Sequence, residues 1–269
     1  MTGSNPILFA FLLTGIAGLA TGLGSCIAFF FRQSNRKFLS LSLGFSGGVM
    51  IYISFAELLR ESQNTLEKLY GGKPGAWIGI AAFFGGIALA MAIDRCIPEA
   101  GNPHEFKGVE EMDSRKSPVS RSRLLRNGFL FALAVGIHNF PEGMAVFMST
   151  LSSPATGISI ALAIAIHNIP EGITVSVPIY QATGSRKKAF LYSLLSGLAE
   201  PLGALCAYCF LMPFLSEVLL TVTFAVVAGI MVFLSFDELL PLAEEYGEHH
   251  LCIYGLISGM LIMALTLAM

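Results

Sequence analysis

The sequence carries little charge for its length. Charged residues make up 13% of its 269 residues, against roughly 25% in soluble domains. Acidic and basic residues nearly balance at a formal net charge of −2, so we expect no basic surface for nucleic acid. The five cysteines give no disulfide framework. Cys206 and Cys209 have the spacing of a metal or redox pair, but their apolar helical setting favours packing. These absences exclude soluble, nucleic-acid-binding and disulfide-stabilised classes.

Long apolar runs fill most of the chain instead. Hydrophobic residues account for 54% of it, and a helix crosses a bilayer with about 20 mostly apolar residues. Eight stretches reach this length, near residues 7–30, 39–59, 76–93, 125–150, 155–180, 189–211, 218–240 and 250–268. We therefore predict an all-α integral membrane protein of eight transmembrane helices. Residues 1–269 form a single transmembrane domain, whose one long polar loop covers 94–124.

The basic residues predict how the chain is oriented. Most of the 16 Lys and Arg residues lie after the first, third and fifth spans, at 32–37, 95–126 and 186–188. Short loops rich in Lys and Arg stay in the cytoplasm. The odd-numbered loops are therefore predicted to be cytoplasmic, including 94–124, and both termini extracytoplasmic, in a multi-pass protein of the cell membrane.

An internal repeat links the second and seventh spans. Residues 46–59 and 227–240 both end in Ser-Phe-x-Glu-Leu-Leu. Because the two spans cross in opposite directions, the repeat is inverted, as in many secondary transporters. It makes spans 1–3 and 6–8 two related halves around spans 4 and 5. The repeat places Glu57 near the outer mouth and Asp237 with Glu238 near the inner one, as gate or vestibule residues or as ordinary interfacial helix ends.

Two nearly identical hexapeptides lie mid-span in the fourth and fifth helices. They read His-Asn-Phe-Pro-Glu-Gly at 138–143 and His-Asn-Ile-Pro-Glu-Gly at 167–172. A carboxylate at the centre of a membrane helix costs at least about 2.5 kcal/mol, so its duplication indicates a shared purpose. His and Glu four residues apart share a helix face, and imidazole with carboxylate suits zinc and related ions. The pattern predicts a metal site.

A third mid-span carboxylate, Glu200, precedes Pro201 in the sixth span. Carboxylates that are buried without a partner take up protons. If the three carboxylates are ionised, one divalent ion leaves the site with a net negative charge, and two ions leave it with a net positive charge. The ligand supply favours two adjacent ions. We expect His167, Glu142 and Glu171 to suit zinc. The oxygen-rich remainder would accept Fe²⁺ or Mn²⁺; it comprises Asn139, Asn168 and Glu200, with the same two Glu.

The paired hexapeptides, with Glu200-Pro201 on the next span, resemble the ZIP family of metal-ion transporters, and most closely a bacterial branch of it. The resemblance covers the whole membrane core. It implies eight helices with both termini outside and uptake of Zn²⁺, with Fe²⁺, Mn²⁺ and Co²⁺ as further cargo. It also implies a binuclear metal site formed by Asn139, Glu142, His167, Asn168, Glu171 and Glu200, with His138 matching a family position on the same path.

Several questions stay open at this stage. A membrane-embedded di-metal enzyme and a metal sensor are alternative classes, although no His-Glu-x-x-His motif and no signalling domain occurs. Metal ions and the lipid bilayer are the expected partners, and metal is expected as cargo rather than as a cofactor. The small residues Gly15, Gly18 and Gly22 favour close helix packing, within a monomer or a homodimer. Proton coupling, and the roles of 94–124 and of His249 with His250, are not readable from sequence.

Overall fold

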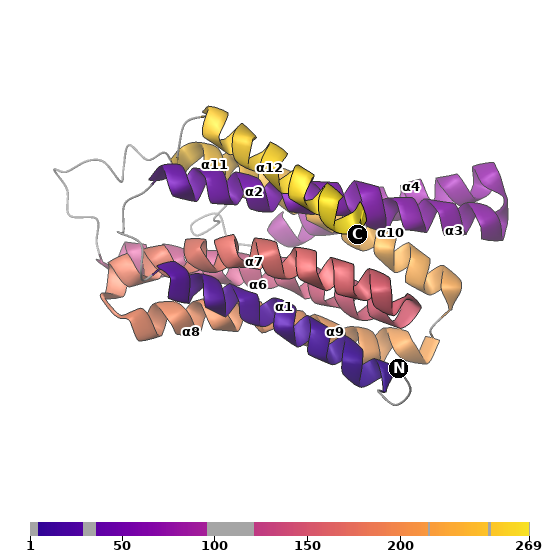
Figure 1. Ribbon diagram of the computed structural model, residues 1–269, viewed down its shortest axis with the longest axis horizontal. Helices are drawn as coiled ribbons and strands as arrows, with labels where there is room; N and C mark the ends of the chain where they lie inside the picture. Colours follow the sequence, from indigo (N-terminus) through magenta and orange to yellow (C-terminus); the bar gives the residue numbers. More distant parts are fainter. Residues whose placement is uncertain (1–4, 29–35, 96–120, 215, 247–248, 269) are drawn as a thin grey trace.

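The protein is a bundle of long helices. The computed structural model describes residues 5–28, 36–95, 121–214, 216–246 and 249–268. Within these ranges every regular element is a helix and none is a strand, and the helices lie roughly along one direction (Figure 1). Most of the predicted polar loop 94–124 lies outside the described residues.

Each predicted span corresponds to one helix or to a stack of shorter ones. The simple spans are α1 (Pro6–Ala28), α4 (Gly72–Arg95), α6 (Arg121–Ser152), α7 (Pro154–Thr183) and α12 (His249–Ala268). The second span joins α2 (Arg36–Ile53), η1 (Ser54–Leu59) and α3 (Arg60–Tyr70). The sixth joins α8 (Arg186–Gly197), α9 (Ala199–Cys206), η3 (Ala207–Leu211) and η4 (Met212–Phe214). The seventh joins α10 (Glu217–Leu234), η5 (Ser235–Leu239) and α11 (Leu240–Tyr246).

Seven helices of the described residues are long and apolar enough to cross a membrane. This confirms the all-α membrane class. The remaining predicted span, near 125–150, lies in α6, which is helical over 32 residues but is not among the seven. Figure 1 shows that α1 begins and α12 ends toward the same side of the bundle.

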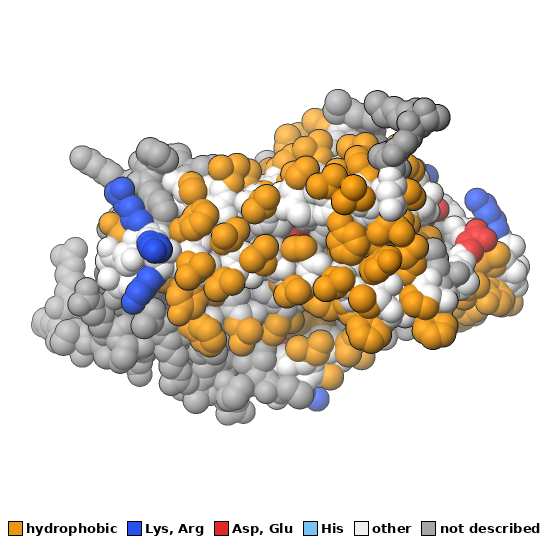
Figure 2. Space-filling model, turned by 90° about the horizontal axis from the view of Figure 1, so that it is seen from below, with side chains coloured by type: hydrophobic (Ala, Val, Ile, Leu, Met, Phe, Trp, Pro, Cys, Tyr) orange, Lys and Arg blue, Asp and Glu red, His pale blue; other side chains and the backbone are white. Residues whose placement is uncertain are grey.

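The outer surface of the bundle is apolar, as contact with lipid requires. On α1 the exposed large side chains recur every three or four residues, at Leu8, Leu12, Ile16, Leu19 and Leu23. Figure 2 shows apolar side chains across the middle of one face, with Lys and Arg side chains toward both ends. A continuous apolar surface of this kind is rare on soluble monomers.

A tight turn sets α6 and α7 side by side. Ser153 caps α7 by accepting a hydrogen bond from the backbone N–H of Thr156 at 3.4 Å, and Pro154 occupies the first helical turn, where its missing N–H costs nothing. Since the turn reverses the chain at once, the two hexapeptides face each other across neighbouring helices.

The repeated segments share the same local irregularity. Each Ser-Phe-x-Glu-Leu stretch forms a π-helical turn, η1 in one copy and η5 in the other. In each, the serine hydroxyl donates to the backbone carbonyl four residues earlier, Ser54 to Met50 at 2.7 Å and Ser235 to Met231 at 2.8 Å. Figure 1 shows α2 and α10 running in opposite directions. The structure thus repeats the sequence match in detail, and in inverted orientation.

Repeat-equivalent glycines make the closest helix contacts. A Cβ on Gly48 would overlap the carbonyl oxygen of Leu256, and one on Gly229 would overlap that of Phe83. These glycines seat α2 against α12 and α10 against α4. In the same way Gly172 lies against Thr21 of α1.

The close contacts divide the bundle into two helix groups. We call α2, α4, α10 and α12 the outer group, and α1, α6, α7, α8 and α9 the inner group. Within the inner group, α6 packs closely on α9, because Gly143 lies against the Glu200 backbone carbonyl. The groups do not coincide with the repeat halves, because α1 packs on α7 and not on α2. An apolar cavity of about 790 Å³ lies where α4 and α10 meet α6 and α8.

We expect Gly229→Ala to lower stability, because its Cβ would meet the Phe83 backbone and force α10 away from α4. Overpacking of this kind costs about 1–3 kcal/mol. The check is the thermal unfolding midpoint in detergent. Gly85→Ala on α4 is the matched control, since nothing lies within 4 Å of its added Cβ. Equal midpoints for both variants would contradict the close contact.

Candidate metal-binding site

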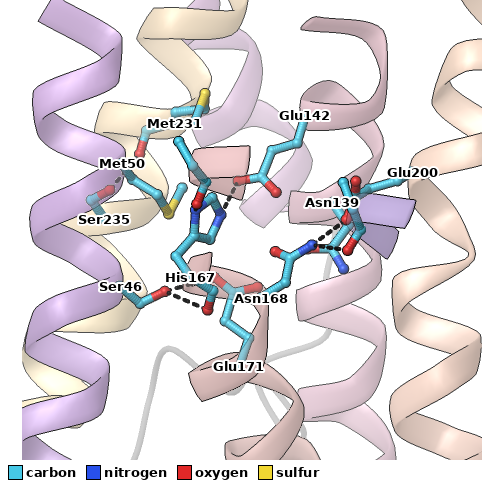
Figure 3. A network of polar contacts seen from close by, with 12 residues as sticks. Ser46, Met50, Asn139, Glu142, His167, Asn168, Glu171, Glu200, Met231 and Ser235 are labelled. Atoms are coloured by element: carbon cyan, nitrogen blue, oxygen red, sulfur yellow. Dashed lines mark hydrogen bonds and ion pairs between the residues drawn. The ribbon is translucent and has the colours of Figure 1, made fainter. Parts of the chain in front are cut away.

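Six of the predicted ligands lie together in the middle of the bundle. Figure 3 shows Asn139 and Glu142 of α6, His167, Asn168 and Glu171 of α7, and Glu200 of α9 directed toward one another. Each of the six is fully buried. Sequence spacing alone placed His167 and Glu171 on one face, and the α6–α7 turn brings the hexapeptide 138–143 to them.

His167 is held in an orientation suited to a cation. Its Nδ1 lies 3.2 Å from the carbonyl oxygen of Ala163, and a carbonyl can only accept, so Nδ1 carries the proton. The opposite nitrogen, Nε2, lies 3.1 Å from Glu142 Oε1. In the neutral ring that nitrogen has only a lone pair facing a carboxylate. A second proton or a metal ion resolves this pairing, and an Nδ1–H bonded to a backbone carbonyl is the usual support of a metal-binding histidine.

Both asparagines turn their amide oxygens inward. Asn139 Nδ2 donates to the carbonyl oxygen of Ser196 at 3.1 Å, and Asn168 Nδ2 donates to that of Ala17 at 2.9 Å and to Glu200 Oε1. Because carbonyls only accept, these contacts fix which amide atom is nitrogen. The two Oδ1 atoms and Glu200 Oε2 are then buried without hydrogen-bond partners among the described residues. Buried oxygens of this kind are ligands that a hard divalent cation prefers.

Ser46 of α2 is a polar neighbour that the sequence reasoning missed. Its hydroxyl lies 3.0 Å from Glu171 Oε1 and 3.3 Å from the carbonyl oxygen of His167, and the residue is fully buried. It stands at the start of the repeated segment 46–59, but serine is common in membrane helices and that signal alone does not mark it.

By ligand type we divide the six side chains into two sets, which we call clusters. One contains His167, Glu142 and Glu171, and the other Asn139, Asn168 and Glu200. Among the described residues, no three His, Cys, Asp or Glu side chains already converge as the ligands of one ion would. They pair with one another instead, His167 with Glu142 and Asn168 with Glu200. Nitrogen and carboxylate ligands on one side and amide with carboxylate oxygens on the other are chemistry for divalent cations, not for acyl or phosphoryl transfer.

Comparison with known proteins agrees with this chemistry. The family profile described as "ZIP Zinc transporter" matches residues 98–267. The chain belongs to the ZIP family. It is 59% identical over 265 residues to the zinc transporter ZupT of Akkermansia muciniphila, covering 98% of both chains. It is 57% identical over 264 residues to that of Streptococcus mutans, again covering 98% of both. To that of Clostridium perfringens it is 53% identical over 274 residues, covering 98% of this chain and 96% of the relative.

Membership in the ZIP family confirms the resemblance seen in the hexapeptides, and the bacterial branch is ZupT. It also confirms that the chain is a multi-pass membrane protein. The expectation that the protein is not an enzyme is confirmed too, because its relatives are transporters.

The remaining predicted residues are His138 and the three gate carboxylates. His138 lies within α6, but its side chain lies outside what the structure describes. Glu57 is half-buried in η1, whereas Asp237 is half-buried and Glu238 buried in η5. Both π-helical turns thus carry the predicted gate carboxylates.

His249, at the start of α12, is paired instead with an acid on the surface. Its Nδ1 lies 2.7 Å from Glu244 Oε1, and both side chains are exposed. No third ligand joins this pair among the described residues.

We expect His167→Ala to weaken Zn²⁺ binding by at least about tenfold, since changes to mere supports of a metal ligand already cost 10- to 100-fold. Mn²⁺ binding should weaken less, because Mn²⁺ relies on oxygen ligands. Competition with a fluorescent chelator measures both affinities in detergent. His250→Ala, at an exposed imidazole of α12, should bind both ions as the wild type does. An equal loss of Zn²⁺ affinity in the two variants would show that His167 is not a specific zinc ligand.

Proposed function

We propose that this protein carries Zn²⁺ across the cell membrane into the cytoplasm, with Fe²⁺, Mn²⁺ and Co²⁺ as further cargo. One observation carries the proposal: nitrogen, carboxylate and amide ligands, all fully buried, gather from three membrane helices in the middle of the bundle. Buried carboxylates at this depth are costly and mark ion pathways. Family membership and the zinc named for its relatives support the same cargo.

The proposed site holds two ions, one in each cluster. His167, Glu142 and Glu171 suit zinc, and the amide oxygens of Asn139 and Asn168 with Glu200 suit a second ion. Glu142 and Glu171 would bridge the two. Carboxylates shared between ions reduce the repulsion between two divalent charges, which a protein interior does not screen well.

The proposed topology has eight spans in a single transmembrane domain, with α6 as the fourth and both termini outside. The exposed Arg186, Lys187 and Lys188 at the start of α8 would then face the cytoplasm. Metal would pass from the outer mouth near Glu57 to the two clusters and leave past Asp237 and Glu238. The shared π-helical turns support a paired role for these carboxylates, because such turns are frequent at functional sites.

We expect wild-type protein in liposomes to take up ⁶⁵Zn²⁺, and Glu142→Ala and Glu171→Ala to abolish uptake, because each removes a ligand from the zinc cluster. Glu67→Ala, at an exposed position of α3, is the matched control and should transport normally. Correct folding of each variant is checked by gel filtration. Equal uptake by all four proteins would show that α6 and α7 do not carry the path, and binding without uptake would favour a metal sensor.

We expect two Zn²⁺ ions per chain in the wild type and one in Glu200→Gln, which keeps the shape of the side chain but removes the charge of the oxygen-rich cluster. Elemental analysis after gel filtration measures the ratio. Glu217→Gln, at an exposed position at the start of α10, should keep both ions. One Zn²⁺ ion per chain in the wild type would contradict the two-ion site.

A further inference from the structure

Ser46 has two hydrogen-bond acceptors and one proton. Its hydroxyl lies 3.0 Å from the Glu171 carboxylate and 3.3 Å from the His167 carbonyl oxygen. A hydroxyl donates one hydrogen at a time, so it can satisfy either acceptor but not both fully. The charged carboxylate is the stronger acceptor, and it is also the one that a bound cation would claim.

The two acceptors lie on a different helix group from Ser46. Ser46 belongs to α2 of the outer group, between Gly44 and Gly48, whose added Cβ atoms would overlap the carbonyls of Cys252 and Leu256 on α12. Glu171 belongs to α7 of the inner group, where Gly172 lies against Thr21. The hydroxyl therefore joins two groups that are each tightly packed within themselves.

A cation at Glu171 would change this bond. The carboxylate is the stronger acceptor of the hydroxyl hydrogen, and a divalent ion bound to Glu171 Oε1 would repel that hydrogen. The hydrogen can then turn to the His167 carbonyl, which leaves the buried hydroxyl satisfied while the carboxylate is released to the ion. A buried hydroxyl without a hydrogen-bond partner is costly. The His167 carbonyl avoids this cost when the hydroxyl leaves the carboxylate.

We propose that Ser46 is a positioning residue that holds the Glu171 carboxylate while the site is empty and yields it when a divalent ion binds. The inference rests on the proposed function. The hydrogen bond between α2 and α7 would then depend on whether a metal ion is bound. It would be strong in the metal-free protein and weaker in the metal-bound protein.

The test compares Zn²⁺ binding and transport by Ser46→Ala, Ser46→Thr and Ser54→Ala. In Ser46→Ala the ion no longer displaces a hydrogen bond to a charged group, so Kd and the apparent KM should fall about fivefold. Vmax should fall as well, because release slows. Ser46→Thr keeps the hydroxyl and should restore wild-type values. Ser54→Ala is the control, since that buried hydroxyl, at the start of η1, donates within its own span to the Met50 carbonyl.

Competition with a fluorescent zinc chelator in nanodiscs gives Kd, and an entrapped zinc indicator in liposomes gives KM and Vmax. Unchanged values in Ser46→Ala, or a weaker Kd, would overturn the proposal, the latter by making the hydroxyl a ligand. If Ser46→Ala does not fold, Ser46→Cys replaces it, and its weaker donor should shift Kd in the same direction. Wild-type protein that neither binds nor transports Zn²⁺ would instead refute the proposed function itself.

Discussion

The cost of burying three carboxylates shapes the rest of this molecule. Glu142, Glu171 and Glu200 are fully buried in the middle of an apolar bundle, where each carries a penalty of several kcal/mol unless it is neutralised or hydrogen-bonded. Neighbouring polar groups offset part of this cost: His167 contacts Glu142, Ser46 contacts Glu171 and Asn168 contacts Glu200. Such pairings stabilise the empty site, and each uses a contact that a cation can replace.

The glycines allow this cluster to form. Three membrane helices can bring their side chains to one point only if their backbones approach closely, and Gly143 against the Glu200 carbonyl and Gly172 against the Thr21 carbonyl provide that approach. Each glycine directly follows a glutamate of its hexapeptide. The short motif therefore supplies both the carboxylate and the space beside it, which explains why Glu and Gly stand together in both hexapeptides.

The repeat and the packing divide the molecule in different ways. By sequence, α2 with η1 matches α10 with η5, and both copies carry the same serine bond and the same π-helical turn. By packing, these two copies lie in the outer group, while the ligands lie in the inner one. A transporter needs one part that holds the ion and another against which it shifts. The boundary between the groups, crossed by the Ser46 hydroxyl, fits that requirement better than the boundary between the repeats.

The sequence predicted the helices and the buried polar residues between them because both depend on local chemistry. The length of the apolar stretches predicts the spans, and a carboxylate repeated in the middle of two membrane helices indicates a functional site. It could not predict which amide atom of Asn168 faces the cluster, because the Ala17 carbonyl that decides this lies 151 residues away. Ser46 escaped for the same reason: its partners lie 121 and 125 residues along the chain. What orients a ligand depends on contacts between distant helices, and these exist only once the inner and outer groups have packed.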